Sequence, residues 1–94
     1  MDIVTVRNRD FAGFTMQTEN SVLLAIRADH GFIACGYINV ETADKLDEAV
    51  AIVTGVGNYV ELLQKPVVTA SRKAAAAGVS PGMSGEEALL KFAG

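Results

Sequence analysis

The single cysteine of this chain, Cys35, is the side chain with the clearest potential for covalent chemistry. It stands between Ala34 and Gly36, and a thiolate beside a glycine can act as a nucleophile in an open pocket. Free cysteine is also among the most frequently buried residue types, and apolar residues flank Cys35 on both sides. We therefore interpret Cys35 first as a core residue and only in the alternative as a nucleophile.

The single histidine, His30, precedes Cys35 by five residues. Five residues of an extended strand span about 16 Å, so the two side chains cannot form a Cys-His pair along one strand. The alternative function is thus a small enzyme with a site shared between subunits, which would bring another histidine or a helix terminus to Cys35. One cysteine and one histidine offer no metal-ligand spacing, and we predict neither a metal site nor a cofactor.

A glycine-bearing segment, residues 54–58, has the sequence TGVGN between a strand-like and a helix-like run. Backbone amides at such a strand-to-helix turn can cradle a phosphate or a carboxylate. The segment lacks the Lys-Ser/Thr ending of a P-loop and the full spacing of a dinucleotide fingerprint, which favours an ordinary turn. A small anionic ligand bound at Thr54, Gly55 and Gly57 is the hypothesis that this segment supports.

Tyr37 and Asn39 follow Cys35 at the end of the same predicted strand. Their polar groups would border a pocket at the sheet edge near Thr54. The simpler interpretation is that Tyr37 packs with a hydrated hydroxyl group and that Asn39 caps a helix. The complete candidate ligand-binding set is Cys35, Tyr37, Asn39, Thr54, Gly55 and Gly57.

The elements that would position these residues follow an α+β pattern. Runs rich in β-branched residues predict strands, and a change of apolar period from two to about 3.6 predicts helices. We expect a mixed sheet, with amino-terminal antiparallel hairpins followed by β-α-β units and with the helices packed on one face. The predicted strands are residues 3–6, 14–18, 21–28, 32–38, 51–54 and 66–69, and the predicted helices are 40–50, 58–64, 71–77 and 84–92.

Two of the predicted helices carry specific internal signals. In the helix at residues 58–64, Val60 and Leu63 are expected to point inward. In the last helix, Ser84 and Glu87 have the spacing of a capping box, and Phe92 belongs to the predicted buried face.

The overall composition predicts self-association. The chain has 94 residues, enough for a single domain over residues 1–94, yet 50% of them are hydrophobic and only 20% are charged. This apolar content exceeds what one small core needs, and a symmetric subunit interface is the usual place for the surplus. We therefore expect a homo-oligomer.

Charge and hydropathy exclude other partners. The net charge is −3 and the basic residues are spread along the chain, whereas nucleic-acid binding needs clustered Lys and Arg. No apolar run approaches the roughly 20 residues that span a bilayer, so no membrane contact is expected. The first residues lack the basic-then-apolar order of a secretory signal, and the expected compartment is the cytoplasm.

Three separated segments resemble one known family. Their sequences are GFIACGYINVETADKL at residues 31–46, AIVTGV at 51–56 and GMSGEEAL at 82–89. In this order they resemble the YunC-like family of bacteria and archaea, domain of unknown function 1805, over roughly residues 23–92. The resemblance implies an α+β fold whose amino-terminal β region, here residues 1–20, mediates tetramer formation. It implies no reaction, cofactor or catalytic residue.

Overall fold

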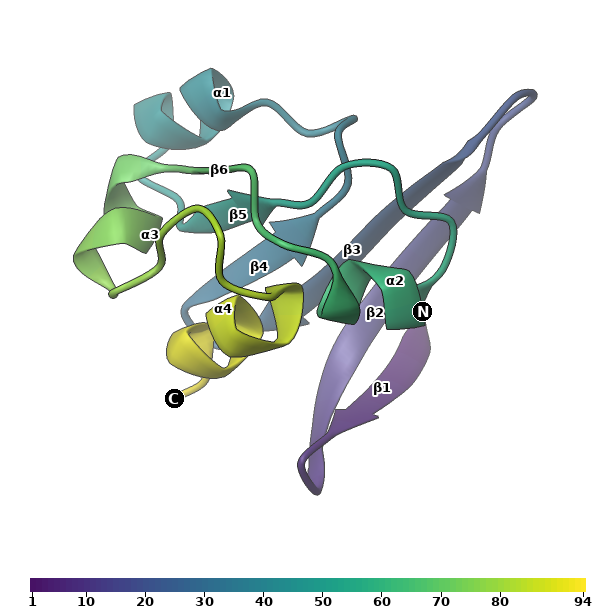
Figure 1. Ribbon diagram of the computed structural model, residues 1–94, viewed down its shortest axis with the longest axis horizontal. Helices are drawn as coiled ribbons and strands as arrows, with labels where there is room; N and C mark the ends of the chain where they lie inside the picture. Colours follow the sequence, from purple (N-terminus) through teal and green to yellow (C-terminus); the bar gives the residue numbers. More distant parts are fainter.

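Six strands form one sheet in chain order in the computed structural model, which describes residues 1–94 (Figure 1). Strands β1 to β4 pair antiparallel, β4 and β5 pair parallel, and β5 and β6 pair antiparallel. The mixed sheet of an α+β domain is therefore confirmed. The strands are β1 (Asp2–Val6), β2 (Arg9–Gln17), β3 (Val22–Ala28), β4 (Gly31–Ala34), β5 (Val50–Ile52) and β6 (Thr69–Ala70).

The amino-terminal strands form a continuous meander because short turns connect them. Arg7 and Asn8, with φ values of 52° and 64°, make the two-residue connection between β1 and β2. Strand β2 begins directly after this turn, at Arg9. It is therefore longer than predicted, because the apolar pattern placed its start at Phe14. The predicted hairpin of β3 and β4 is confirmed, with Ala28 opposite Gly31 across the turn.

Strand β4 ends earlier than predicted. It stops at Ala34, because the chain turns there and the Ile38 amide donates to the Cys35 carbonyl at 3.2 Å. The Cys35 amide still donates to the Leu24 carbonyl at 3.0 Å, so this residue extends the contact with β3 by one bond. The predicted strand 32–38 is therefore wrong in its second half, where a turn leads into the first helix.

Each of the four helices begins at a side chain that accepts hydrogen bonds from the first turn, as local sequence predicts. These N-cap residues are Asn39, Asn58, Ser71 and Ser84, and the capping box of Ser84 is complete. None of the helices has the length and apolar character needed to cross a lipid bilayer. The helices are α1 (Val40–Lys45), α2 (Tyr59–Gln64), α3 (Arg72–Ala76) and α4 (Gly85–Phe92).

Two helices differ from the sequence prediction in detail. Helix α1 stops at Lys45 instead of reaching residue 50, because Asp47 takes a left-handed conformation and Val50 enters β5. On α2 the prediction for Val60 is wrong, since its side chain is 59% exposed, and the fully buried residue is Leu62. A six-residue helix has so few positions that a shift of two residues exchanges its buried and exposed sides.

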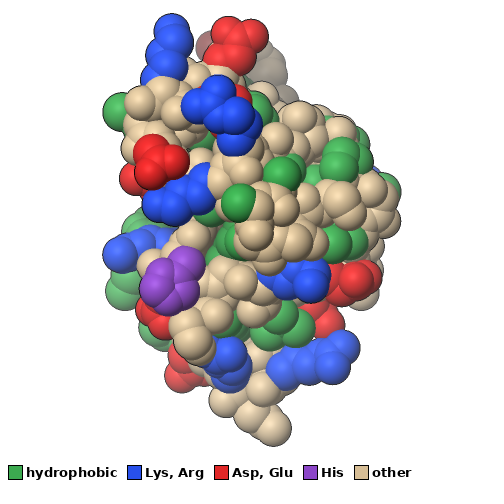
Figure 2. All heavy atoms as spheres, turned by 90° about the vertical axis from the view of Figure 1, so that its left-hand side faces the viewer, with side chains coloured by type: hydrophobic (Ala, Val, Ile, Leu, Met, Phe, Trp, Pro, Cys, Tyr) green, Lys and Arg blue, Asp and Glu red, His purple; other side chains and the backbone are tan.

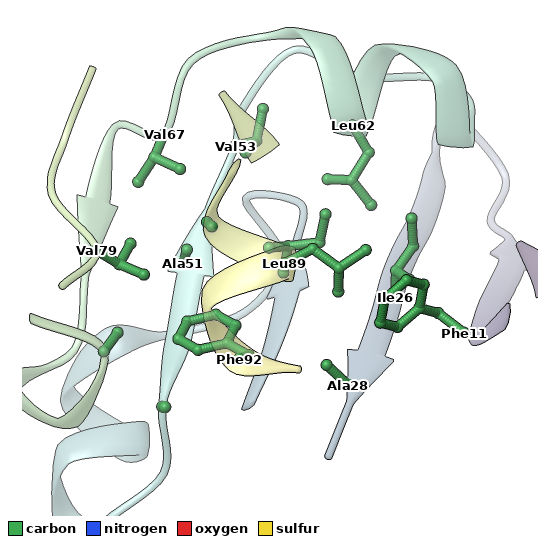
Figure 3. Packing of buried hydrophobic residues seen from close by; sticks show 14 of the residues in the cluster. Phe11, Ile26, Ala28, Ala51, Val53, Leu62, Val67, Val79, Leu89 and Phe92 are labelled. Carbon is green, nitrogen blue, oxygen red and sulfur yellow. The ribbon is translucent and has the colours of Figure 1, made fainter. Parts of the chain in front are cut away.

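The main core lies on one face of the sheet, which we call the inner face. Figure 3 shows Leu89 and Phe92 of α4 packed among residues of the strands, including Ile26 and Ala51. Helices α2 and α3 contribute Leu62 and Ala74 to the same cluster.

Helix α1 packs on the opposite face, which we call the outer face. Its Ala43 joins a separate small cluster with Ala34, Val50 and Ile52 of β4 and β5. The expectation of helices on one face thus holds for α2, α3 and α4 but not for α1. The alternation of β5 explains the difference, because every residue of this strand is buried and both of its faces need a cover.

Candidate functional site

Four of the six candidate ligand-binding residues lie together at the carboxyl ends of β4 and β5. Because β4 and β5 are parallel, the residues that follow both strands emerge at the same edge, which is where open α/β sheets commonly bind ligands. Two adjoining hollows lie there, and Tyr37 borders both. Asn39 and Thr54 line one hollow with Tyr37, and Gly55 lines the other.

The first hollow has a volume of about 440 Å³ and a mixed polar and apolar lining that includes Thr54 and Thr69. Asn39 contributes less than predicted, because its side-chain oxygen accepts from the amides of Glu41 at 2.7 Å and Thr42 at 3.3 Å. The capping interpretation of Asn39 is therefore confirmed. The hydroxyl groups of Thr54 and Thr69 are among the groups of this hollow that can contact a ligand.

The second hollow, of about 470 Å³, lies between Tyr37 and the β2–β3 turn. The Tyr37 side chain is 55% exposed, and its hydroxyl lies 3.3 Å from the hydroxyl of Thr18. Tyr37 thus separates the two hollows with a side chain that is more than half exposed, which agrees with the simpler interpretation made from the sequence. Because Tyr37 lines both hollows, its hydroxyl group can form a hydrogen bond with a ligand in either one.

The TGVGN loop is closed by side chains of the chain itself. The Gly57 amide donates to the Glu61 carboxylate at 2.7 Å, and the Lys65 ammonium donates to the Gly55 carbonyl at 2.6 Å. Glu61 therefore occupies, at Gly57, the place where an external anion was expected. Gly55 has a φ of 70°, so this position needs a glycine for its turn.

Cys35 lies away from the hollows. Its side chain is 5% exposed, belongs to the inner-face core, and accepts from the Leu24 amide at 3.3 Å through the sulfur. His30 lies in the turn before β4, whereas Cys35 follows the end of that strand, so the two are not brought together. The core interpretation of Cys35 is confirmed, and a nucleophile at this position gains no support.

A polar cluster that the sequence did not reveal ties α2 to the amino-terminal hairpin. The Tyr59 hydroxyl donates to the Asp2 carboxylate at 2.6 Å and accepts from the Thr15 hydroxyl at 2.7 Å. Burial, reinforced by the hydrogen bond to Asp2, raises the pKa of Tyr59 above its ordinary value of 10.0. No spacing in the sequence could indicate a contact between residues 57 positions apart.

This cluster predicts a pH-dependent difference between wild type and Tyr59→Phe. A raised pKa favours the protonated phenol in the folded state, so its contribution is complete below pH 10 and declines as pH rises through the folded pKa. We expect Tyr59→Phe to lower the free energy of unfolding by about 1 kcal/mol at pH 8. Urea titrations at pH 8 and pH 11 measure this difference, which should shrink at the higher pH.

Tyr37→Phe is the matched control, because Tyr37 is the other tyrosine and is 55% exposed. Its effect on the free energy of unfolding should be small at both pH values. A Tyr59→Phe difference as large at pH 11 as at pH 8 would contradict the proposed role of the protonated hydroxyl.

The outer face of the amino-terminal meander carries apolar side chains that no helix covers. Strand alternation places Ile3, Phe14 and Met16 there, opposite the buried Val4 and Phe11. They are 64%, 41% and 56% exposed, respectively. We call the outer surface of β1 to β3 the open face.

Comparison with known sequences supplies the family. Residues 34–92 match the family described as Domain of unknown function (DUF1805). The uncharacterized protein YunC of Bacillus subtilis (strain 168) is 32% identical over 93 residues, covering 95% of this chain and 92% of that protein. The chain belongs to this family.

A solved structure gives the YunC-like fold independent support. The crystal structure of a protein of unknown function, TA1206 from Thermoplasma acidophilum, matches with a TM-score of 0.90 and 30% sequence identity. The match covers 97% of this chain and 89% of that one, so it includes the amino-terminal meander outside residues 34–92. The predicted family is confirmed. The strands that form the open face precede residue 34, and their fold is shared with the Thermoplasma acidophilum protein.

Proposed function

We propose that this YunC-like chain works as a homo-oligomeric assembly module whose copies meet through the open face. The observation that carries the proposal is the exposure of Ile3, Phe14 and Met16 on one uncovered side of the sheet. Removing apolar surface from water contributes about 25 cal/mol per Å². A second copy presents the same apolar side chains, so a two-fold contact can cover both sets at once.

The size of the open face indicates that one such contact is insufficient. Strands β1, β2 and β3 have five, nine and seven residues. At usual strand spacings they present about 330 Å² in projection. A standard interface buries about 800 Å² on each partner, so a dimer held by this face alone belongs to the weak class.

The free edge of β1 can supply the second contact. This strand pairs only with β2, and its sequence DIVTV contains neither the proline nor the lysine that commonly protects an edge. Antiparallel pairing of β1 with β1 of a second copy, about an axis perpendicular to the sheet, leaves both open faces on the same side. The apolar strip is then doubled, and two such pairs stack into the tetramer that the family resemblance implies.

Substitution of Ile3 tests this proposal. The wild-type chain has a mass of 9.9 kDa, and we expect light scattering to give a molar mass about four times larger. Ile3→Glu should lower this molar mass. A buried glutamate without a partner costs several kcal/mol, more than a weak face can supply. Val60→Glu is the matched control, because Val60 is 59% exposed but lies on α2.

The variants separate two explanations of a lower mass. If Ile3→Glu and Val60→Glu lower the mass equally, added charge rather than the open face is responsible and the proposal fails. A wild-type chain that stays monomeric at all concentrations also contradicts it.

A further inference from the structure

A hollow of about 470 Å³ lies on the outer side of the sheet beside the β3–β4 turn, and the proposed assembly does not account for it. Its volume is within the range of about 300 to 1,000 Å³ that is usual for ligand pockets. Its apolar lining includes Phe14, Ala25 and Phe32. The hollow therefore joins the open face to a polar rim.

The strand register leaves room for a flat group between two aromatic rings. Phe14 of β2 pairs with Ala25 of β3, and Phe32 lies on β4. Phe32 pairs with Arg27, two residues along β3 from Ala25, so the two phenylalanines lie on a diagonal across β3, about 12 Å apart, with Ala25 and Arg27 between them. Aromatic rings stack at centroid distances of about 4.5 to 7 Å, so one planar ring fits between the two.

Arg27 borders this gap, directly across from Phe32 in the β3–β4 register. Both ion pairs of the chain involve other residues, and the Arg27 guanidinium has no carboxylate partner. If a second copy covers the open face, this cation leaves water, which is costly unless an anion pairs with it. A guanidinium matches a planar carboxylate through two parallel hydrogen bonds.

The rim limits the charge of the ligand. Lys73 adds a second basic side chain, but its ammonium group already lies 3.7 Å from the Asp47 carboxylate. Asp29 and Glu48 also border the hollow and would repel a polyanion. Figure 2 shows basic and acidic side chains alternating around the single histidine, His30, on this side of the molecule. A ligand with a single negative charge suits this balance.

We infer that the hollow binds a small planar aromatic carboxylate and that the second copy closes it. The carboxylate pairs with Arg27, and the aromatic ring lies between Phe14 and Phe32 above Ala25. This inference rests on the proposed assembly, because the second copy is what buries Arg27. By reciprocal linkage, the ligand must then strengthen self-association.

Sedimentation equilibrium with benzoate tests the inference. We expect benzoate to lower the dissociation constant of the assembly about tenfold. Benzamide, which has the same shape without the charge, and acetate, which lacks the ring, should leave it unchanged. Arg27→Met removes the buried cation, so this variant should associate without benzoate as tightly as wild type does with it, and benzoate should have no further effect.

Arg7→Met is the matched control, because Arg7 lies in the β1–β2 turn outside the hollow. The self-association of this variant should respond to benzoate as that of the wild type does. Weaker association of Arg27→Met overturns the inference, because it would mean that a carboxylate of the second copy pairs with Arg27. A wild-type assembly that does not respond to benzoate overturns it as well.

Amide spectra recorded on the same samples separate this inference from the proposed function. A chain that stays monomeric with and without benzoate contradicts the assembly. Saturable shifts of the Ala25 and Phe32 amides that disappear in Arg27→Met would still support the ligand site in that case. Unchanged wild-type spectra overturn the ligand site whatever the mass.

Discussion

We expect Phe92→Ala to lower the free energy of unfolding by about 4 kcal/mol. Phe92 is the last residue of α4, its side chain is fully buried, and it packs in the inner-face core (Figure 3). The space it leaves cannot be filled by collapse, because Gly31 lies directly against the ring and has no side chain to follow it. The loss is a large part of the 5 to 15 kcal/mol that usually stabilises a domain.

Urea unfolding at one fixed protein concentration measures this effect, since self-association would otherwise change the apparent stability. Phe92→Leu is the graded control, with an expected loss of about 1 kcal/mol because most of the volume remains. Equal losses for the two variants would show that the backbone of α4, rather than the cavity, determines the result.

The second large effect is expected from Gly85→Ala, at about 3 kcal/mol of lost stability. Gly85 begins α4, and a Cβ atom at this position would overlap the carbonyl oxygen of Leu62 and lie 3.1 Å from its carbonyl carbon. The obstacle is backbone, which cannot rotate aside as a side chain can. Alanine must therefore push α4 away from α2 and loosen the core between them.

Gly57→Ala is the matched control for this prediction. The nearest atom to its added Cβ would be the Glu61 carboxylate oxygen at 3.5 Å, an ordinary contact with a flexible side chain. We expect a change of about 0.5 kcal/mol or less in urea unfolding. If Gly85→Ala is as mild as Gly57→Ala, α2 and α4 are not held together as closely as the structure indicates.

Local signals predicted much of this fold. Side-chain caps such as Asn39 and Ser84 act over two or three residues, so the start of each helix could be located from its neighbours alone. The β3–β4 hairpin was equally accessible, because Asp29 and His30 form a short turn between two apolar runs. The family resemblance implied the α+β class, and the structure confirms it.

The errors arose where longer-range packing overrides local pattern. The end of α1 depends on Val50 joining β5, a pairing with β4 that the apolar period alone cannot reveal. The exposure of Val60 and the burial of Leu62 depend on where α4 lies against α2. Sequence periodicity locates such short helices but does not determine their rotation.

The candidate site was predicted in part. Tyr37, Asn39, Thr54 and Gly55 do border adjoining hollows, because the parallel pairing of β4 and β5 brings the segments after both strands to one edge. Gly57 was assigned to an external anion that Glu61 replaces within the chain. The hollow beside Arg27 was missed, because it depends on side chains from three strands whose register only the structure reveals.

The position of α4 in the sequence affects how the chain folds during translation. Proteins are synthesised from the amino terminus, so the whole meander leaves the ribosome before Leu89 and Phe92 exist. Until then Ile26 and Ile33 have no helix to cover them, although both are fully buried in the finished fold. The nascent sheet therefore exposes apolar side chains on both of its faces. Chaperones that bind apolar surface have their best opportunity to bind this sheet just before α4 is synthesised.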